Sequence, residues 1–301
     1  YFQIIQFEKE FNQSNNEIAV IVARGTIVDG TQPPGTIGGD STSNLIKEAH
    51  ENKNIKAIVL RVDSGGGGVF ASELIRQELV AAKEKGIKII ASMGNVAASG
   101  GYWISANANE IWASHNTITG SIGIFGIIPT FDRALNEIGI NSDGVKTSAL
   151  DLSGSVAQPL DPAFSRLMQQ EIEYGYQRFL NLVSEARSMS IQEVDEIAQG
   201  RVWAGSTALE LGLVDNLGNL EEAIQRAAEL AEIDEYTTYY PSQEIDWRQQ
   251  LLESFSAGLK FFIPEIIRKN IIIKESINSL KEIDSFNDPK GLYVRCEDCL
   301  I

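Results

Sequence analysis

The sequence predicts an α/β protein in which a parallel sheet is followed by a helical C-terminal region. Between residues 18 and 130, short apolar runs rich in Ile and Val alternate with glycine-rich turns and helical patterns. Strands that are buried on both faces have such runs, and crossover helices join them in parallel sheets. From residue 162 onward the sequence changes to successive helical patterns, each with an apolar stripe and a polar opposite face.

Strands are expected in the first half of the chain at residues 18–23, 55–62, 87–93 and 110–114. Their short lengths and their β-branched residues favour strands over helices. Helices are expected at residues 44–52 and 69–86. Gly86 follows the last apolar residue of the second helix, at the position where a glycine commonly ends a helix.

The second half of the chain is expected to be mainly helical, at residues 163–189, 190–199, 205–212 and 219–233. Ser190 and Glu193 have the spacing of a capping box, which begins a helix. Residues 255–273 are apolar, but charged residues and Pro264 interrupt them. Such a segment is typical of packing or oligomer contacts, and contact with a membrane surface is the alternative.

Composition excludes several classes of protein. The chain has 301 residues, 43% of them hydrophobic, and a formal net charge of −16. The apolar content excludes disorder over most of the length, and the acidic balance argues against a nucleic-acid partner. No apolar run reaches the ~18 residues that a membrane-spanning helix needs. Because the sequence begins at Tyr1 rather than Met, we expect it to be part of a longer chain or a processed product.

Few side chains could bind a metal ion. The histidines are His50, which is expected at a solvated helix end, and His115. Cys296 and Cys299 form a C-x-x-C pair near the C-terminus, without the four ligands of a structural zinc site. The pair forms a disulfide, stays as two thiols, or takes part in a metal or redox site. We predict no metal and no cofactor.

The ends of two expected strands carry the residues most suited to chemistry. Four glycines at 65–68 follow one strand, and Ser99 stands among small residues before an expected helix. Both strand ends face the same edge of a parallel sheet, where ligands bind. The glycines either let the backbone approach a ligand closely or serve tight packing only. Ser99 either caps the helix or reacts where the helix N-terminus stabilises negative charge.

Three long segments make the sequence recognisable: VDSGGGGV at residues 62–69, SMGNVAASGGYWIS at 92–105 and IWASHNTITGSIGIFG at 111–126. With the tail FNDPKGLYVRCEDC, they resemble the signal peptide peptidase A (protease IV) family of serine proteases, in particular the C-terminal repeat of its long two-repeat form. The resemblance implies a ClpP/crotonase-like fold, a repeated β-β-α superhelix with a parallel sheet. It also implies a linker from a preceding repeat at 1–16, a peptidase domain at 17–235, and a helical extension at 236–301 near an oligomer contact or a membrane.

The resemblance assigns roles to individual residues. Ser99, in the A-S-G-G-Y motif, corresponds to the family nucleophile. The backbone N–H groups of Gly66 and Gly100 correspond to the oxyanion donors, and Gly65 stands where the family usually has proline. Ser121, in the T-G-S-I-G motif, corresponds to the serine that orients the base.

The base of this family is a neutral lysine that accepts the proton of the serine. In the two-repeat form the lysine comes from the N-terminal repeat. The corresponding stretch of this chain places Thr147 at the lysine position and Lys146 one residue earlier. Neighbouring side chains of an extended strand point to opposite faces, so we expect Lys146 to be a surface residue and the base to come from the N-terminal repeat. Lys146 as the base is the alternative.

The expected function is that of a Ser-Lys endopeptidase that degrades cleaved signal peptides and other apolar peptides at the extracytoplasmic face of a membrane. This chain would supply the nucleophile, and a peptide would add as a strand beside the glycine loop. The expected partners are other copies in a closed ring, the N-terminal repeat and the membrane. The alternatives are a non-catalytic peptide-binding scaffold and a crotonase-type enzyme that acts on acyl thioesters.

Overall fold

The protein is organised around a parallel sheet, which is seen in a computed structural model that describes residues 15–144, 155–242, 288, 292–296 and 299. The strand order is β10-β8-β6-β4-β1-β12, with β7 paired to β6 and β11 to β7. All pairs are parallel except β10–β8. The predicted α/β class with a parallel sheet is therefore confirmed. The strands are β1 (Glu17–Arg24), β4 (Ile55–Ser64), β6 (Lys88–Ala98), β7 (Glu110–Ala113), β8 (Ile118–Gly120), β10 (Val202–Ala204), β11 (Asn216–Leu217) and β12 (Thr237–Tyr239).

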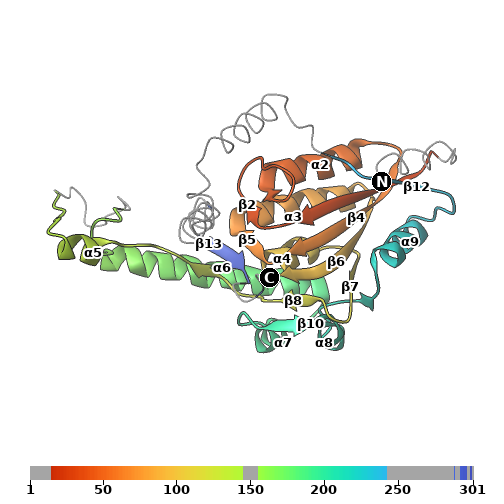
Figure 1. The fold of residues 1–301 in the computed structure, drawn as a ribbon. Coiled ribbons are helices and arrows are strands. Elements are labelled where there is room, and N and C mark those ends of the chain that lie inside the picture. Colours follow the sequence, from red (N-terminus) through yellow and green to blue (C-terminus); the bar gives the residue numbers. More distant parts are fainter. Residues whose placement is uncertain (1–14, 145–154, 243–287, 289–291, 297–298, 300–301) are drawn as a thin grey trace, which may run out of the picture.

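Helices cover both faces of this sheet (Figure 1). Helices α2 (Gly39–Glu51) and α3 (Val69–Glu84) pack on one face, and α9 (Leu220–Leu230) packs on the other. Strand β1 is continuously apolar because both of its faces are buried. Ala19 and Ile21 belong to the core beneath α2 and α3, whereas Ile18 and Val20 belong to the core beneath α9. Successive side chains of a strand point to opposite faces, so both sets must be apolar.

A second, smaller sheet lies beside the first and has the order β3-β2-β5-β13-β9. Its middle strand, β5, consists of three of the four consecutive glycines at residues 65–68, where the sequence predicted a turn. A Cβ atom on Gly67 would lie 1.9 Å from the carbonyl oxygen of Ile27, so only glycine allows the neighbouring strand to approach this closely. The strands are β2 (Ile27–Val28), β3 (Ile37–Gly38), β5 (Gly66–Gly68), β9 (Phe125–Gly126) and β13 (Leu292–Arg295).

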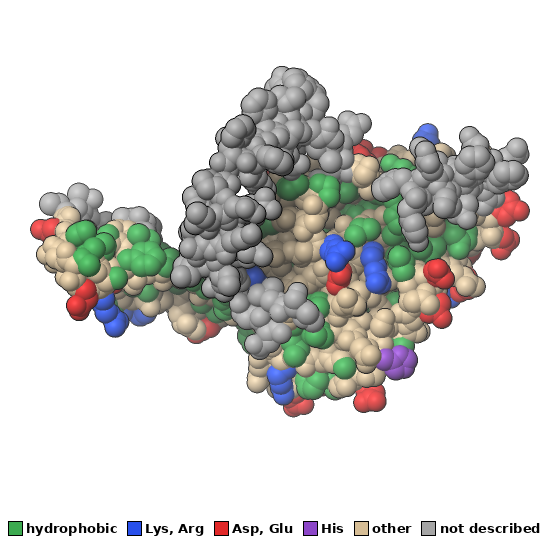
Figure 2. Space-filling view, viewed as in Figure 1, with side chains coloured by type: hydrophobic (Ala, Val, Ile, Leu, Met, Phe, Trp, Pro, Cys, Tyr) green, Lys and Arg blue, Asp and Glu red, His purple; other side chains and the backbone are tan. Residues whose placement is uncertain are grey.

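An arm projects from the body at the left of Figure 1 and contains α5 (Asp132–Glu137) and the first half of α6 (Pro162–Arg187). The second half of α6 lies against the body, where Phe179 packs on Trp103 with ring centroids 4.6 Å apart and ring planes tilted by 50°. Hydrophobic side chains gather on the arm (Figure 2), including the exposed Phe131 and Ile138. Helices α7 (Ile191–Ile197) and α8 (Gly205–Glu210) complete the body. Across the described parts of the chain, no helix combines the length and the apolar content that crossing a bilayer requires.

Several local predictions are confirmed, and others change. Ser190 and Glu193 form the predicted capping box of α7, and Gly86 follows the C-cap residue of α3, Lys85, with φ +90°. The strand expected at 87–93 continues to Ala98, so that it ends directly before Ser99. The boundaries at 16/17 and 235/236 stay predictions, although the tail of the chain contributes two strands, β12 and β13, to the two sheets. Residues 255–273 and 1–14 lie outside the described residues.

His50 is not the solvated residue that its position near a helix end suggested. Its Nε2 lies 2.6 Å from Glu78 Oε1, and Lys85 Nζ lies 2.9 Å from its Nδ1. The side chain is 2% exposed. The reason is tertiary, because α3 packs along α2 and covers its C-terminal end.

Candidate active site

Ser99 lies in a sharp turn between β6 and helix α4 (Gly100–Ser105). Its backbone angles are φ 55° and ψ −114°, a combination that L-residues rarely adopt and that is found mostly at functional sites. Ser99 is 1% exposed to solvent, and its Oγ is buried without a hydrogen-bond partner among the described residues. Although Ser99 stands at the N-cap position, its side chain makes no capping bond. The helix-capping interpretation therefore does not explain this serine.

The fold brings Gly66 next to Gly100. Two backbone N–H groups can bind the same oxyanion only if they lie close together, so this proximity agrees with the predicted role of both residues. A Cβ atom on Gly100 would lie 3.1 Å from the Cα of Gly66, and one on Gly66 would lie 2.6 Å from the amide nitrogen of Gly100. Gly66 also has φ +100°, which glycine adopts without strain. In this structure the Gly66 N–H donates to Ser64 Oγ at 3.1 Å. An oxyanion would therefore have to compete with Ser64 for this donor.

Ser121 directly follows β8, the strand whose last residue, Gly120, pairs with Ala98 next to Ser99. The N–H of Ser99 donates to the carbonyl oxygen of Gly120 at 2.8 Å, and the N–H of Ser121 donates to the carbonyl oxygen of Arg201 at 2.7 Å. Ser121 is 6% exposed and has a positive φ of 49°. Two serines with positive φ thus stand next to each other across the β6–β8 pair, and the role of Ser121 in orienting a base stays a prediction.

A partly buried carboxylate supports the helix that follows Ser99. Glu73 of α3 accepts a hydrogen bond from the indole Nε1 of Trp103 at 2.8 Å and two from Arg76 at 2.7 Å each. Burial raises the pKa of Glu73, but the hydrogen bonds from Arg76, Gln77 and Trp103 outweigh burial and leave this pKa below its ordinary value. The ionised carboxylate therefore links α3 to α4 at neutral pH.

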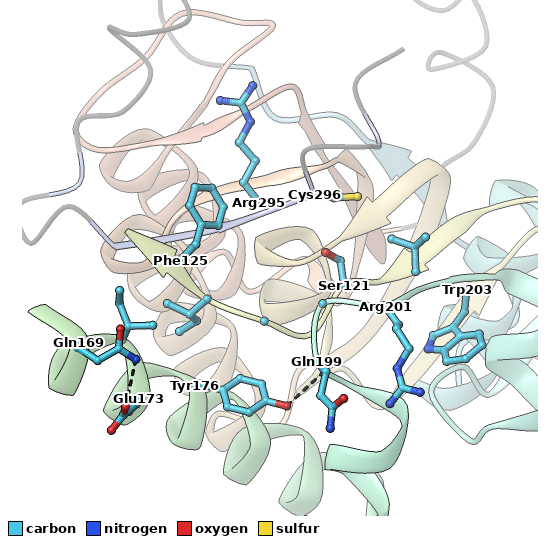
Figure 3. Close-up of a pocket in the computed structure, with 15 residues that line it drawn as sticks. Ser121, Phe125, Gln169, Glu173, Tyr176, Gln199, Arg201, Trp203, Arg295 and Cys296 are labelled. Carbon is cyan, nitrogen blue, oxygen red and sulfur yellow. Dashed lines mark hydrogen bonds between the residues drawn. The ribbon is translucent and has the colours of Figure 1, made fainter. Parts of the chain in front are cut away.

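A pocket of about 860 Å³ opens beside Ser121. Figure 3 shows that its walls come from the segment between β8 and β9 with β9 itself, from helix α6, from residues 199–203 at the start of β10, and from the C-terminal strand. Tyr176 donates to Asp195 Oδ1 at 2.5 Å, and burial together with this bond raises the pKa of Tyr176 to about 12, so that its hydroxyl stays protonated at neutral pH. Sequence analysis missed this pocket because its residues come from distant segments without a shared motif.

The candidate bases are not in the described site. Lys146 and Thr147 both lie outside the described residues. His115 is exposed. A lysine with a lowered pKa could act as a base, and burial lowers the pKa of Lys83, with Lys88 adding to the effect. Lys83, however, lies close in sequence to the start of β6, whereas Ser99 follows the end of β6. At about 3.3 Å per residue of strand, an 11-residue strand keeps the two far apart.

The C-terminal tail packs against the glycine loop, which the sequence did not indicate. Strand β13 pairs antiparallel with β5, with Val294 opposite Gly67. Cys296 and Cys299 form a disulfide, one of the three states that the sequence left open. Within the described part of the chain, no three His, Cys, Asp or Glu side chains are grouped so that they could hold a metal ion.

The sequence matches a known peptidase family and several of its members. Residues 81–234 match the family described as Peptidase family S49. The chain is 45% identical to Protease 4 of Salmonella typhi over 289 residues, which are 94% of this chain and 46% of that protein. It is 40% identical to Protease 4 of Haemophilus influenzae, covering 94% of this chain and 47% of that protein. The chain thus spans about half the length of these relatives.

Shorter relatives and solved structures also match. A putative signal peptide peptidase SppA of Enterococcus faecium is 31% identical over 97% of this chain and 84% of its own length. A variant of the 1510-N membrane-bound stomatin-specific protease aligns with a TM-score of 0.49 at 13% identity, covering 76% of this chain and 99% of that one. A ClpP1 variant from Listeria monocytogenes aligns with a TM-score of 0.45 at 14% identity, covering 74% of this chain and 98% of that one.

Proposed function

Because the chain belongs to peptidase family S49, we propose that it supplies the nucleophile of a serine endopeptidase, and that this nucleophile is Ser99. One observation carries the proposal. The Ser99 hydroxyl is buried without a hydrogen-bond partner among the described residues, in a strained turn at the start of a helix. A buried hydroxyl normally finds a partner, and backbone strain persists where function requires it.

In the proposed reaction, Ser99 Oγ attacks the carbonyl carbon of a peptide bond while its proton passes to the amine of a neutral lysine. The N–H groups of Gly100 and Gly66 stabilise the negative oxygen of the tetrahedral intermediate. The protonated lysine then donates to the leaving amine, and an acyl-enzyme forms. Water hydrolyses the acyl-enzyme by the same steps. Ser121, which directly follows β8 beside Ser99, holds the lysine in place.

We propose that the lysine comes from a preceding repeat of the parent protein. The length of the relatives supports this, because this chain covers only 46% of Protease 4 from Salmonella typhi. A lysine must lose its proton to act as a base, and its ordinary pKa is ~10.4. Enclosure between two repeats would desolvate the amine and lower that pKa. Lys146 is the competing candidate within this chain.

The proposed substrates are apolar peptides in extended conformation, such as the remnants of cleaved signal peptides, at the extracytoplasmic face of a membrane. The Cys296–Cys299 disulfide supports this location, because disulfides persist in oxidising compartments. The exposed apolar side chains of the arm, among them Ile138 at 70% and Phe131 at 53%, support a homo-oligomer. Light scattering on the full-length protein tests the oligomer, and a monodisperse monomer at micromolar concentration would contradict it.

Substitution of Ser99 tests the nucleophile. In the full-length protein, we expect Ser99→Ala to abolish peptide hydrolysis and labelling by a fluorophosphonate, with an unchanged melting temperature. Ser105→Ala is the matched control, because Ser105 is a buried serine of the same helix whose hydroxyl donates to the Gly101 carbonyl at 2.7 Å. The control should keep its activity.

Two results would favour the alternatives. Retained hydrolysis in Ser99→Ala would move the nucleophile to another residue. A protein that binds apolar peptides but neither hydrolyses them nor reacts with the fluorophosphonate would be a peptide-binding scaffold, and turnover of an acyl-CoA in the same assay would indicate a crotonase-type enzyme.

A further inference from the structure

Ser121 is held in place by a short turn of residues 199–201, which directly precedes β10. The N–H of Ser121 donates to the carbonyl oxygen of Arg201 at 2.7 Å, and the N–H of Gly200 donates to the carbonyl oxygen of Ile122 at 3.0 Å. Ser121 has a positive φ of 49°, a conformation that persists only where the surroundings enforce it. The turn at 199–201 therefore fixes the backbone that carries the Ser121 hydroxyl.

This turn is itself in an unfavourable conformation. Gln199 has φ 58° and Gly200 has φ 75°, so two consecutive residues have positive φ. For Gln199, which has a side chain, this conformation is costly. The Gln199 N–H has a partner outside the turn, because it donates to the hydroxyl oxygen of Tyr176 at 3.2 Å (Figure 3). A side chain of α6 thus holds the turn at its strained residue.

Asp195 fixes the direction of the Tyr176 hydroxyl. The hydroxyl has one proton, which it donates to Asp195 Oδ1 at 2.5 Å. Its oxygen lone pairs are therefore left to accept the Gln199 N–H. The raised pKa of Tyr176, about 12, keeps the proton in place at neutral pH. Asp195 belongs to α7 and Tyr176 to α6, so one hydroxyl joins both helices to the turn.

A simple link between two helices would explain the bond from Tyr176 to Asp195 alone. It does not explain why the same hydroxyl also binds Gln199, two residues before the carbonyl group that holds Ser121. Tyr176, Gln199 and Ser121 all line the pocket of about 860 Å³. The whole connection therefore lies at the candidate active site and not behind it.

We propose that Tyr176 is a positioning residue of the peptidase and that it acts through Ser121. Its hydroxyl, oriented by Asp195, holds the turn at 199–201, and the turn holds Ser121 where the serine hydroxyl can orient the amine of the catalytic lysine. Substrate need not contact Tyr176 for this role. The inference rests on the proposed function, because it assumes that Ser121 orients the base.

The test removes the Tyr176 hydroxyl alone. Because the Tyr176 ring packs on the hydrophobic core, Tyr176→Phe keeps this packing and deletes only the two hydrogen bonds. In the full-length protein we expect kcat on an apolar peptide to fall about tenfold, which is part of the ~10²–10⁴-fold that a positioned base contributes. KM should stay the same, because the base acts in the transition state and not in substrate binding. Hydrogen exchange at the Ser121 amide should become faster, since this amide donates to the turn.

Further variants separate positioning from a general structural role. Tyr174→Phe is the matched control, because Tyr174 is a tyrosine of the same helix that is 63% exposed, and it should match the parent protein in every readout. Asp195→Asn keeps an oxygen that can accept the Tyr176 proton and should keep most of kcat, whereas Asp195→Ala should lower kcat as Tyr176→Phe does. In a Ser121→Ala background, Tyr176→Phe should lower kcat no further, because residues that act through one another are not additive.

The outcomes distinguish this inference from the proposed function. Unchanged kcat or unchanged amide exchange in Tyr176→Phe would overturn the positioning role, while loss of activity in Ser99→Ala and Ser121→Ala would leave the proposed function standing. An equal further loss of kcat in the Ser121→Ala background would also overturn the positioning role, because Tyr176 would then act independently of Ser121. A Ser121→Ala protein with full activity would contradict both the proposed role of Ser121 and this inference.

Discussion

Ser99 and Gly66 show how much chemistry depends on single backbone conformations. Ser99 is held at φ 55° and Gly66 at φ +100°, and Gly66 lies next to Gly100, the residue that follows Ser99. For a serine this conformation is costly, whereas for a glycine it is not. The surrounding strands must therefore hold Ser99 in place, while Gly66 contributes by lacking a side chain.

Gly66→Ala tests the oxyanion loop at this scale. The new methyl group would stand 1.9 Å from the Val294 carbonyl oxygen, so the loop must move away from Gly100. We expect peptidase activity of the full-length protein to fall by at least ~10²-fold, the typical effect of losing one oxyanion donor, as measured by kcat/KM on an apolar peptide.

Gly86→Ala is the matched control for this substitution. Gly86 has a similar φ of +90°, but nothing lies within 4 Å of its missing side chain. Its substitution should lower the free energy of unfolding by ~1–2 kcal/mol, the cost of a left-handed conformation, and should leave kcat/KM unchanged. Equal losses of activity in both variants would mean that strain alone, and not the position of Gly66, explains the effect.

At the scale of elements, α4 depends on α3 for its position. Helix α4 has six residues, too few to be stable alone, and it is anchored where Trp103 donates to Glu73 and packs on Phe179 of α6. The turn that carries Ser99 is thus fixed by side chains from two other helices. This explains how a strained turn can persist at the start of so short a helix.

Glu73→Gln tests this anchor through its pH dependence. The folded pKa of Glu73 is lowered from 4.5, so the stability that its ionised form contributes is present above pH 4.5 and is lost as the pH falls through the lowered pKa. We expect the variant to unfold with ~1–3 kcal/mol less free energy at pH 7, measured by denaturant titration with tryptophan fluorescence. The difference from the parent protein should shrink below pH 4.5.

Glu51→Gln serves as the control, because Glu51 is an exposed residue of α2. Its free energy of unfolding should match that of the parent protein at both pH values. A Glu73→Gln protein whose deficit stays constant down to pH 3 would show that lost packing, and not the charge, accounts for the effect.

At the scale of the whole molecule, the nucleophile and the oxyanion loop are proposed to lie in this chain, and the base is proposed to come from elsewhere. We expect the 301-residue chain alone to hydrolyse apolar peptides poorly, because a positioned general base typically contributes ~10²–10⁴-fold. Adding the separately produced N-terminal half of the parent protein should restore hydrolysis. If instead the isolated chain is active and Lys146→Ala removes that activity, the base lies within this chain.

Local sequence pattern was sufficient to predict the parallel sheet, its covering helices and the turn at Ser99 between a strand and a helix. The apolar run of β1 reflects its burial on both faces, and the small residues around Ser99 reflect the close packing of β6, β5 and α4. Secondary structure and close packing of this kind depend on neighbouring residues in the chain and on side-chain size. The periodicity of apolar residues and the size of each residue therefore predict them.

Only the tertiary structure decided what covers these elements. Asp288 accepts a hydrogen bond from Phe70, which is 218 residues away in the sequence. Strand β13 pairs with β5 in the second sheet, and α3 covers His50. No local pattern marks such contacts, because the partners are chosen by the packing of the whole chain. The same holds for Ser99: its sequence permits a helix cap as readily as a nucleophile, and the choice rests on a hydroxyl that the fold buries without capping the helix.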